Sequence, residues 1–188
     1  MLFTGCQKEL PVYTEPVVVV DDRDTTGNHN IDTTDEDDNV YYYIRFQVNG
    51  VDVEYNAYTK ATFPVYVRQG TNLYSCQVEG QLQLNGTINT INLTINDSVP
   101  IVINKLFTDK LLFNATQGVI GYNDAGNNIF SSVAAAPDAD VKLVLTEITT
   151  AFVTGTFSGK TRNVLENTGG IFPESADITN GSFKVRRF

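Results

Sequence analysis

YYYIRFQVNGVDVEYNAY, residues 41–58, consists of two segments of alternating polarity that are joined by Asn49-Gly50. Both central positions of a two-residue type I′ turn need positive φ, and Asn-Gly is the dipeptide that suits them best. The turn therefore predicts a β-hairpin between Tyr41–Val48 and Val51–Tyr58. It also fixes the register of the two strands, because residues at equal distances from the turn face each other.

The predicted register separates the hairpin into two faces of opposite polarity. The pairs on one face are apolar or aromatic: Val48 with Val51, Phe46 with Val53, Ile44 with Tyr55, and Tyr42 with Ala57. The pairs on the other face carry polar groups: Gln47 with Asp52, Arg45 with Glu54, Tyr43 with Asn56, and Tyr41 with Tyr58. We expect the first face to pack on a core and the second to meet solvent or a partner.

Strand-like segments continue along the rest of the chain, with turn signals about every eight to twelve residues. A second Asn-Gly, at 85–86, predicts a hairpin that pairs Val78 with Leu93 and Cys76 with Ile95, with Leu82 and Leu84 on the same face and Asn89 opposite Leu82. Residues 105–112 are compatible with either a strand or a short helix. Further strands are predicted at Phe63–Arg68, Ile101–Leu106, Gly118–Tyr122, Asn128–Val133, Val141–Ile148, Phe152–Ser158 and Ser182–Arg187. The sequence thus predicts an all-β domain, an antiparallel β-sandwich or partly closed barrel of about ten strands.

The charge is concentrated at the N-terminus. The 188-residue chain has a formal net charge of -9, which argues against nucleic acid as a partner. Residues 1–38 hold ten acids and two bases, whereas residues 39–188 hold the other 12 acids and 11 bases, a net charge of -1. We interpret the acidic segment as a flexible tether that charge repulsion extends.

The first residues resemble the end of a bacterial lipoprotein signal. Met1-Leu2-Phe3-Thr4-Gly5-Cys6 places small residues before a Cys, whose thiol would accept the lipid. The following Gln7, Lys8 and Glu9 are similar to the export signal that sends Bacteroidetes lipoproteins to the outer face of the outer membrane. The alternative is a stray thiol near the terminus. We therefore divide the chain into a signal remnant (1–5), an acidic tether (6–38) that begins at the lipid anchor Cys6, and a single β domain (39–188).

Two segments near the C-terminus carry a family resemblance. VTGTFSG, residues 153–159, and ITNGSFKV, residues 178–185, resemble the G-T-F-S and I-T-x-G-x-F-x-V strands that end a family of small Bacteroidetes surface lipoproteins. FQVNG, residues 46–50, resembles the opening strands of that family. The resemblance implies an all-β lipoprotein of unassigned activity that is anchored in the outer membrane and faces the cell exterior.

The residue inventory argues against catalysis and against a cofactor. His29 is the single histidine and lies in the tether, so a Ser–His–acid or Cys–His pair cannot form within the β domain. The paired carboxylates Asp52/Glu54 and Asp138/Asp140 have the composition of a glycosidase pair, but their positions on a polar hairpin face and in a loop favour solvated surface. We predict a protein that is not an enzyme and acts as an accessory or structural subunit docked to another outer-membrane protein.

The polar face of the first hairpin is the predicted contact surface. It holds aromatic side chains beside charged and amide groups: Tyr41, Tyr43, Arg45, Glu54, Asn56 and Tyr58. Such groups suit a protein partner, and flat rings next to amides also suit a glycan. The absence of Trp from the chain argues against the glycan, because sugar-binding platforms usually rely on Trp. A carbohydrate-binding module is therefore the alternative interpretation.

Two further patterns suit a surface protein. Asp-Ser/Thr triplets that resemble Bacteroidetes O-glycosylation sites occur around Thr25, Thr33 and Ser98. Asp22, Asp24 and Thr26, followed by Gly27, resemble the first half of a calcium loop. Position twelve of that loop is Thr33 and not a bidentate Glu, so we favour a solvated spacer over a metal site.

Overall fold

The computed structural model describes residues 40–68, 70–82, 89–112, 115–164 and 174–188, and the described part contains strands and turns but no helix. Its fourteen strands are β1 (Tyr43–Val48), β2 (Val51–Tyr55), β3 (Tyr58–Thr62), β4 (Val65–Arg68), β5 (Thr71–Gln81), β6 (Thr90–Asp97), β7 (Leu106–Phe107), β8 (Leu111–Leu112), β9 (Ala115–Thr116), β10 (Gly118–Asn123), β11 (Ile129–Ser131), β12 (Lys142–Ile148), β13 (Phe152–Asn163) and β14 (Ser175–Arg187). In the described part of the chain, nothing forms a helix with the length and apolarity needed to cross a membrane.

The first hairpin has the predicted turn and register up to Tyr55. Asn49 and Gly50 have φ of 50° and 82°, as a type I′ turn requires. The pairs from Val48–Val51 to Ile44–Tyr55 are formed as predicted. The prediction that the hairpin extends to Tyr58 is wrong: β2 ends at Tyr55, and Tyr58 begins β3, which pairs with β5. The bend allows Ala61 of β3 to reach the core, where it is fully buried.

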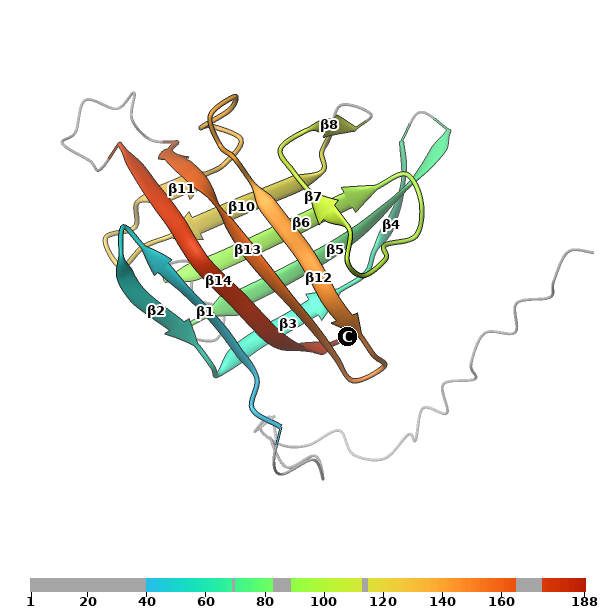
Figure 1. The fold of residues 1–188 in the computed structure, drawn as a ribbon, viewed down its shortest axis with the longest axis horizontal. Coiled ribbons are helices and arrows are strands. Elements are labelled where there is room, and N and C mark those ends of the chain that lie inside the picture. The colour runs from blue at the N-terminus through green and yellow to red at the C-terminus, as the bar shows by residue number, and fades with distance from the viewer. Residues whose placement is uncertain (1–39, 69, 83–88, 113–114, 165–173) are drawn as a thin grey trace, which may run out of the picture. The chain divides into compact units, whose positions relative to one another are not determined.

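Twelve of the strands form one large sheet that folds over into two layers, and β8 and β9 form a separate two-stranded sheet. Neighbouring strands follow the order β2-β1-β14-β3-β5-β6-β10-β11-β13-β12-β7, and β13 also pairs with β14. This extra pairing closes a ring through β14, β3, β5, β6, β10, β11 and β13. Figure 1 shows β1, β14, β13 and β12 crossing in front of β3, β5, β6 and β10. The predicted all-β sandwich or partly closed barrel is confirmed.

One pairing in the large sheet is parallel. β14 is antiparallel to β1 through Lys184 and then meets β3 in parallel at Arg186 and Arg187. The direction follows from the chain: β1 runs opposite to both β2 and β14, so β2 and β14 point the same way, and β3 continues β2 after a short bend. The expectation of a wholly antiparallel sheet is therefore wrong at this position.

The second hairpin, β5–β6, has the predicted register. Val78 pairs with Leu93 and Cys76 with Ile95, and all four side chains are buried. The Leu82 amide donates to the Asn89 carbonyl, which confirms that these two residues are opposite each other. Leu82 itself is 53% exposed, so its predicted place on the core face is wrong, because it lies beyond the end of β5. The turn at Asn85-Gly86 and Leu84 lie outside the described residues.

The segment 101–112 differs most from the sequence prediction. The sequence predicts a strand at Ile101–Leu106, but the chain turns at Asn104, whose φ is 60°, and pairs with β12 only at Leu106–Phe107. The helical alternative for 105–112 is also excluded, because this segment contains β7 and β8. Phe107 is fully buried and anchors the segment to the core. The other predicted strands are found with shifted ends, as β4 and β10–β14.

The two C-terminal motifs fit together across β13 and β14. Gly155 lies opposite Phe183, and Gly181 lies opposite Phe157. Both rings are buried in the core between the layers. A Cβ on Gly155 would lie 2.5 Å from Phe183 Cζ and 2.5 Å from the carbonyl oxygen of Val144. The glycines therefore make room for the aromatic rings, which explains the G-T-F and G-S-F patterns in physical terms.

Candidate binding surface

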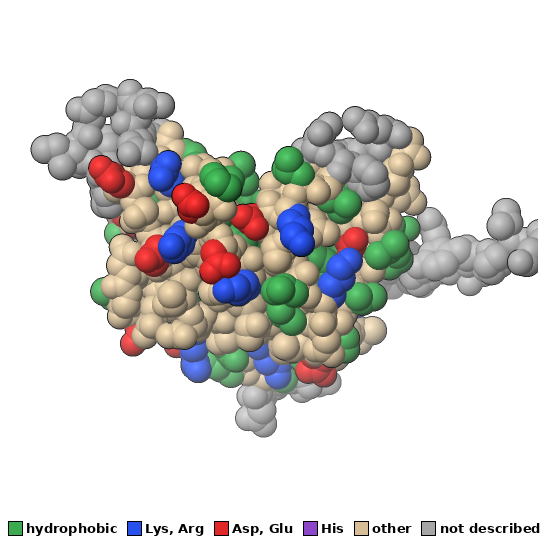
Figure 2. All heavy atoms as spheres, turned by 45° about the horizontal axis from the view of Figure 1, so that its top comes forward, with side chains coloured by type: hydrophobic (Ala, Val, Ile, Leu, Met, Phe, Trp, Pro, Cys, Tyr) green, Lys and Arg blue, Asp and Glu red, His purple; other side chains and the backbone are tan. Residues whose placement is uncertain are grey.

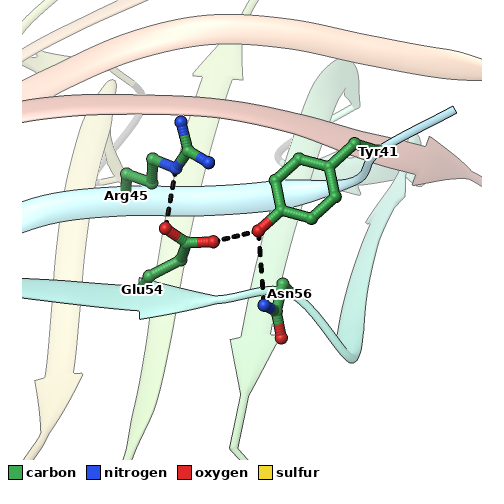
Figure 3. Close-up of polar contacts among 4 residues, drawn as sticks. All are labelled: Tyr41, Arg45, Glu54 and Asn56. Carbon is green, nitrogen blue, oxygen red and sulfur yellow. Dashed lines mark hydrogen bonds and ion pairs between the residues drawn. The ribbon is translucent and has the colours of Figure 1, made fainter.

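Five predicted site residues form one hydrogen-bonded and stacked group on the polar face of the β1–β2 hairpin and directly beside it. We call Tyr41, Tyr43, Arg45, Glu54 and Asn56 the Tyr–Arg cluster. Arg45 Nε donates to Glu54 Oε2 at 2.8 Å, and the Tyr41 hydroxyl donates to Glu54 Oε1. Asn56 Nδ2 donates to the Tyr41 hydroxyl at 3.3 Å (Figure 3). Glu54 thus accepts hydrogen bonds from both a tyrosine and an arginine.

The two tyrosine rings stack and share one cation. The ring centroids of Tyr41 and Tyr43 are 5.9 Å apart, with an interplanar angle of 25°. The guanidinium carbon of Arg45 lies 4.5 Å from the centroid of Tyr43 and 5.4 Å from that of Tyr41. Arg45 therefore covers ring surface on which a sugar would otherwise stack.

The cluster also fixes charge states. Hydrogen bonds from Tyr41 and then from Arg45 hold the pKa of Glu54 below its usual value. The hydrogen bond to Glu54 raises the pKa of Arg45 further above its already high value. The cluster therefore presents an ion pair, not a neutral acid, at neutral pH.

A shallow depression of about 310 Å³ adjoins the cluster, lined by Arg45, Phe46, Gln47, Asp52, Val53, Glu54 and Asn180. Asn180 of β14 has a φ of 53° and lies at a β-bulge, where the pairing with both β1 and β13 shifts by a residue. Its Nδ2 donates to Gln47 Oε1 at 2.8 Å, and Gln47 Nε2 donates to Asp52 Oδ1 at 2.9 Å. A chain of polar groups thus crosses β14, β1 and β2.

Sequence reasoning missed Asn180. An Asn within a strand pattern and directly before Gly181 was the available signal, because Asn tolerates positive φ better than other non-glycine residues. The sequence also predicts that Tyr58 lies on the polar face of the first hairpin. The structure places Tyr58 in β3, opposite Gln81 of β5, so it is not part of the Tyr–Arg cluster. Asn56 lies beyond the last pair of the β1–β2 ladder, Ile44–Tyr55, and its amide donates to the Tyr41 hydroxyl.

Ser98, the described candidate for O-glycosylation, follows a buried aspartate. Asp97 is 2% exposed, pairs with Lys105, and accepts a hydrogen bond from the Ser98 amide at 2.8 Å. Asp97, the aspartate of this Asp-Ser pattern, therefore has a structural role. The other predicted residues of the anchor, export signal, glycosylation sites and calcium loop lie outside the described residues: Cys6, Gln7, Lys8, Glu9, Thr25, Thr33, Asp22, Asp24 and Thr26.

Other chemistry-bearing groups in the described chain are buried or solvated. Cys76 is fully buried, and burial raises the pKa of its thiol to about 12. Asp140 forms an exposed ion pair with Lys142 at 3.0 Å. Figure 2 shows basic and acidic side chains interspersed among apolar ones on the face that it presents. The described side chains of that face therefore carry no broad field of one sign.

No protein-family model, no curated protein sequence and no solved structure matches the chain.

Proposed function

We propose that this chain is a non-catalytic surface protein, lipid-anchored through Cys6 in the outer membrane, that docks onto another outer-membrane protein. The observation that carries the docking role is the Tyr–Arg cluster, which is exposed to solvent and yet ordered by its own contacts. Tyr41 is 50% exposed, and the Arg45 side chain also has half of its surface exposed.

The composition and order of the cluster favour a protein partner. Tyr and Arg are enriched among the residues that dominate protein–protein binding energy. Glu54 fixes both side chains before a partner arrives, so docking loses less side-chain entropy than it would with mobile groups.

Glycan binding is a second candidate, and a separate observation favours it. The depression beside the cluster is lined by two carboxylates, two amides and a guanidinium, the groups that bind sugar hydroxyls. The stacking surface is less suited to a sugar, because Arg45 covers the tyrosine rings. A sugar would therefore bind through hydrogen bonds in the depression.

The anchor part of the proposal rests on the sequence around Cys6 and on the acidic residues 6–38. A Cys6→Ser variant should lose a fatty-acid label that the native protein incorporates and should leave the membrane fraction. Retention of both label and membrane association in this variant would contradict the anchor.

The docking role is tested by cross-linking in membranes from cells that make this chain. We expect a reproducible cross-linked complex that Tyr43→Ala and Arg45→Ala weaken, while Tyr58→Ala, an exposed tyrosine outside the cluster, leaves it intact. Equal complexes for all three variants would contradict docking at this surface. Binding of the purified protein to a glycan array, lost on Asn180→Ala, would support the second candidate.

A further inference from the structure

β2 has one backbone edge that no other described strand pairs with. It stands at one end of the strand order in the large sheet, and its described neighbour is β1 alone (Figure 1). In a two-residue hairpin, the residues next to the turn exchange backbone hydrogen bonds, and the bonding then alternates along each strand. Val51 and Val53 therefore bond to β1, whereas the backbone amides and carbonyls of Asp52 and Glu54 point away from it. In the described part of the chain, nothing bonds to these outward groups.

The side chains along this edge alternate between apolar and acidic. Val51 and Val53 lie on one face, where Val51 is 67% exposed and Val53 is half-buried against the core. Asp52 and Glu54 lie on the opposite face, and both residues are exposed. A strand that adds to β2 would therefore meet apolar side chains on one face and carboxylates on the other.

Asp52 forms no ion pair within the described residues. Glu54 is paired with Arg45 at 2.8 Å, and the other ion pairs of the described chain involve different carboxylates. The side-chain contact of Asp52 is a hydrogen bond of 2.9 Å from the neutral amide of Gln47. Arg45 therefore offsets Glu54, and the carboxylate of Asp52 gives the outward face of this edge an uncompensated negative charge.

This charge argues against a second copy of the chain as the added strand. Two β2 strands that pair antiparallel through their outward groups would place Asp52 opposite Asp52 or Glu54 of the copy. Like charges directly opposite each other destabilise a strand pair, whereas opposite charges stabilise it. The edge therefore suits a strand that carries Lys or Arg at the position opposite Asp52.

From this edge we infer how the docking partner is held: it contributes an extended, basic segment that pairs with β2 and becomes the next strand of the sheet. The inference rests on the proposed docking function and adds the structure and charge of the partner segment. The backbone groups of Asp52 and Glu54 bond to the segment, and a Lys or Arg of the segment pairs with the Asp52 carboxylate. Apolar side chains alternate with that cation and lie beside Val51. The Tyr–Arg cluster, on the same hairpin, contacts the partner next to this segment.

A photo-cross-linking residue in place of Val51 tests the contact in membranes from cells that make this chain. We expect a cross-link to a segment of a different protein in which Lys or Arg alternates with apolar residues, as peptide mass spectrometry can identify. A cross-linked segment without Lys or Arg, a cross-link to a second copy of this chain, or the absence of any cross-link would overturn the inference.

Two changes at Asp52 separate backbone pairing from charge. Asp52→Pro removes an outward amide but no hydrogen bond to β1, a position at which edge strands tolerate proline, and should lower the cross-linked yield about tenfold. Asp52→Lys keeps the amide and should lower the yield about fivefold, because it repels the basic side chain of the segment. Glu147→Lys, the same reversal at an exposed acid of β12, is the matched control and should leave the yield unchanged. Circular dichroism shows whether each variant is folded.

The outcomes distinguish the two proposals. A yield that Tyr43→Ala abolishes but that both changes at Asp52 leave intact would retain docking and overturn the added strand. A yield that Asp52→Pro lowers and Asp52→Lys does not would overturn the basic character of the segment. A yield that none of these changes affects would overturn both docking at this surface and the added strand.

Discussion

Replacing Gly155 by alanine is expected to destabilise the domain through a steric clash at the centre of the core. Gly155 lies in β13 opposite Phe183, which is 2% exposed. The added Cβ would lie 2.5 Å from Phe183 Cζ and 2.5 Å from the Val144 carbonyl oxygen. Unstrained van der Waals contact between carbon atoms needs about 3.5–4.0 Å, so the Phe183 ring and the Val144 backbone must both move.

The magnitude follows from two opposing effects. Overpacking of a close-packed core costs about 1–3 kcal/mol. Alanine offsets about 0.4–1 kcal/mol of this, because it restricts the unfolded chain more than glycine does. We therefore expect the free energy of unfolding to fall by about 1–2 kcal/mol, and Tm to fall by about 2–4 °C for each kcal/mol.

Urea unfolding monitored by circular dichroism measures this change, and Gly121→Ala is the matched control. Gly121 is also a strand glycine, but the nearest atoms to an added Cβ there are 3.8 Å away, an ordinary contact. Gly121→Ala should be neutral or slightly stabilising. Adding Phe183→Leu to Gly155→Ala should recover part of the cost of the clash. Equal stability of the Gly155→Ala and Gly121→Ala proteins would refute the reasoning.

Three further predictions follow from individual side chains. The pKa of Glu54 is lowered in the folded protein, so the carboxylate stabilises the fold above its unfolded pKa of about 4.3, and this stabilisation is lost as pH falls through the folded pKa. The difference in Tm between the unaltered protein and Glu54→Gln should therefore vanish in acid. A difference in Tm that grows in acid would contradict the ion pair. Lys105→Ala leaves the carboxylate of Asp97, which is 2% exposed, without its cation, and should lower the free energy of unfolding in urea by about 1–3 kcal/mol. Adding Asp97→Asn should recover part of this loss. Burial and a raised pKa of about 12 should prevent Cys76 from reacting with a thiol reagent until urea unfolds the domain; rapid labelling of the native protein would show that the thiol is accessible.

Local turn chemistry made the first part of the fold predictable. Asn49-Gly50 determines a turn type by itself, and the register of β1 and β2 follows without any knowledge of the rest of the chain. The same reasoning gave the register of β5 and β6 away from the turn. Five of the six predicted surface residues were brought together for this reason, since all five lie in or directly beside this one hairpin.

Long-range pairing explains what the sequence could not give. Tyr58 leaves the hairpin because β3 pairs with β5 and with the end of β14, far away in the chain. The segment around β7 has too few residues in each strand to show a periodic pattern. Asn180 takes its orientation from a bulge that two neighbouring strands share, so no local pattern indicates that its amide reaches Gln47.

The position of β14 has a consequence for the order of folding. This strand pairs with β1, β3 and β13, so both β1 and β3, near the start of the domain, find a neighbour more than a hundred residues later in sequence. Contacts between residues so far apart in sequence form slowly, because the chain loses the entropy of the loop between them before it gains the energy of pairing. During synthesis the ring therefore stays open until β14 has emerged, and β1 and β3 are left with unpaired backbone edges for most of that time. A chain halted after β13 should consequently aggregate through β1 and β3, whereas adding a peptide of the β14 sequence should restore its solubility.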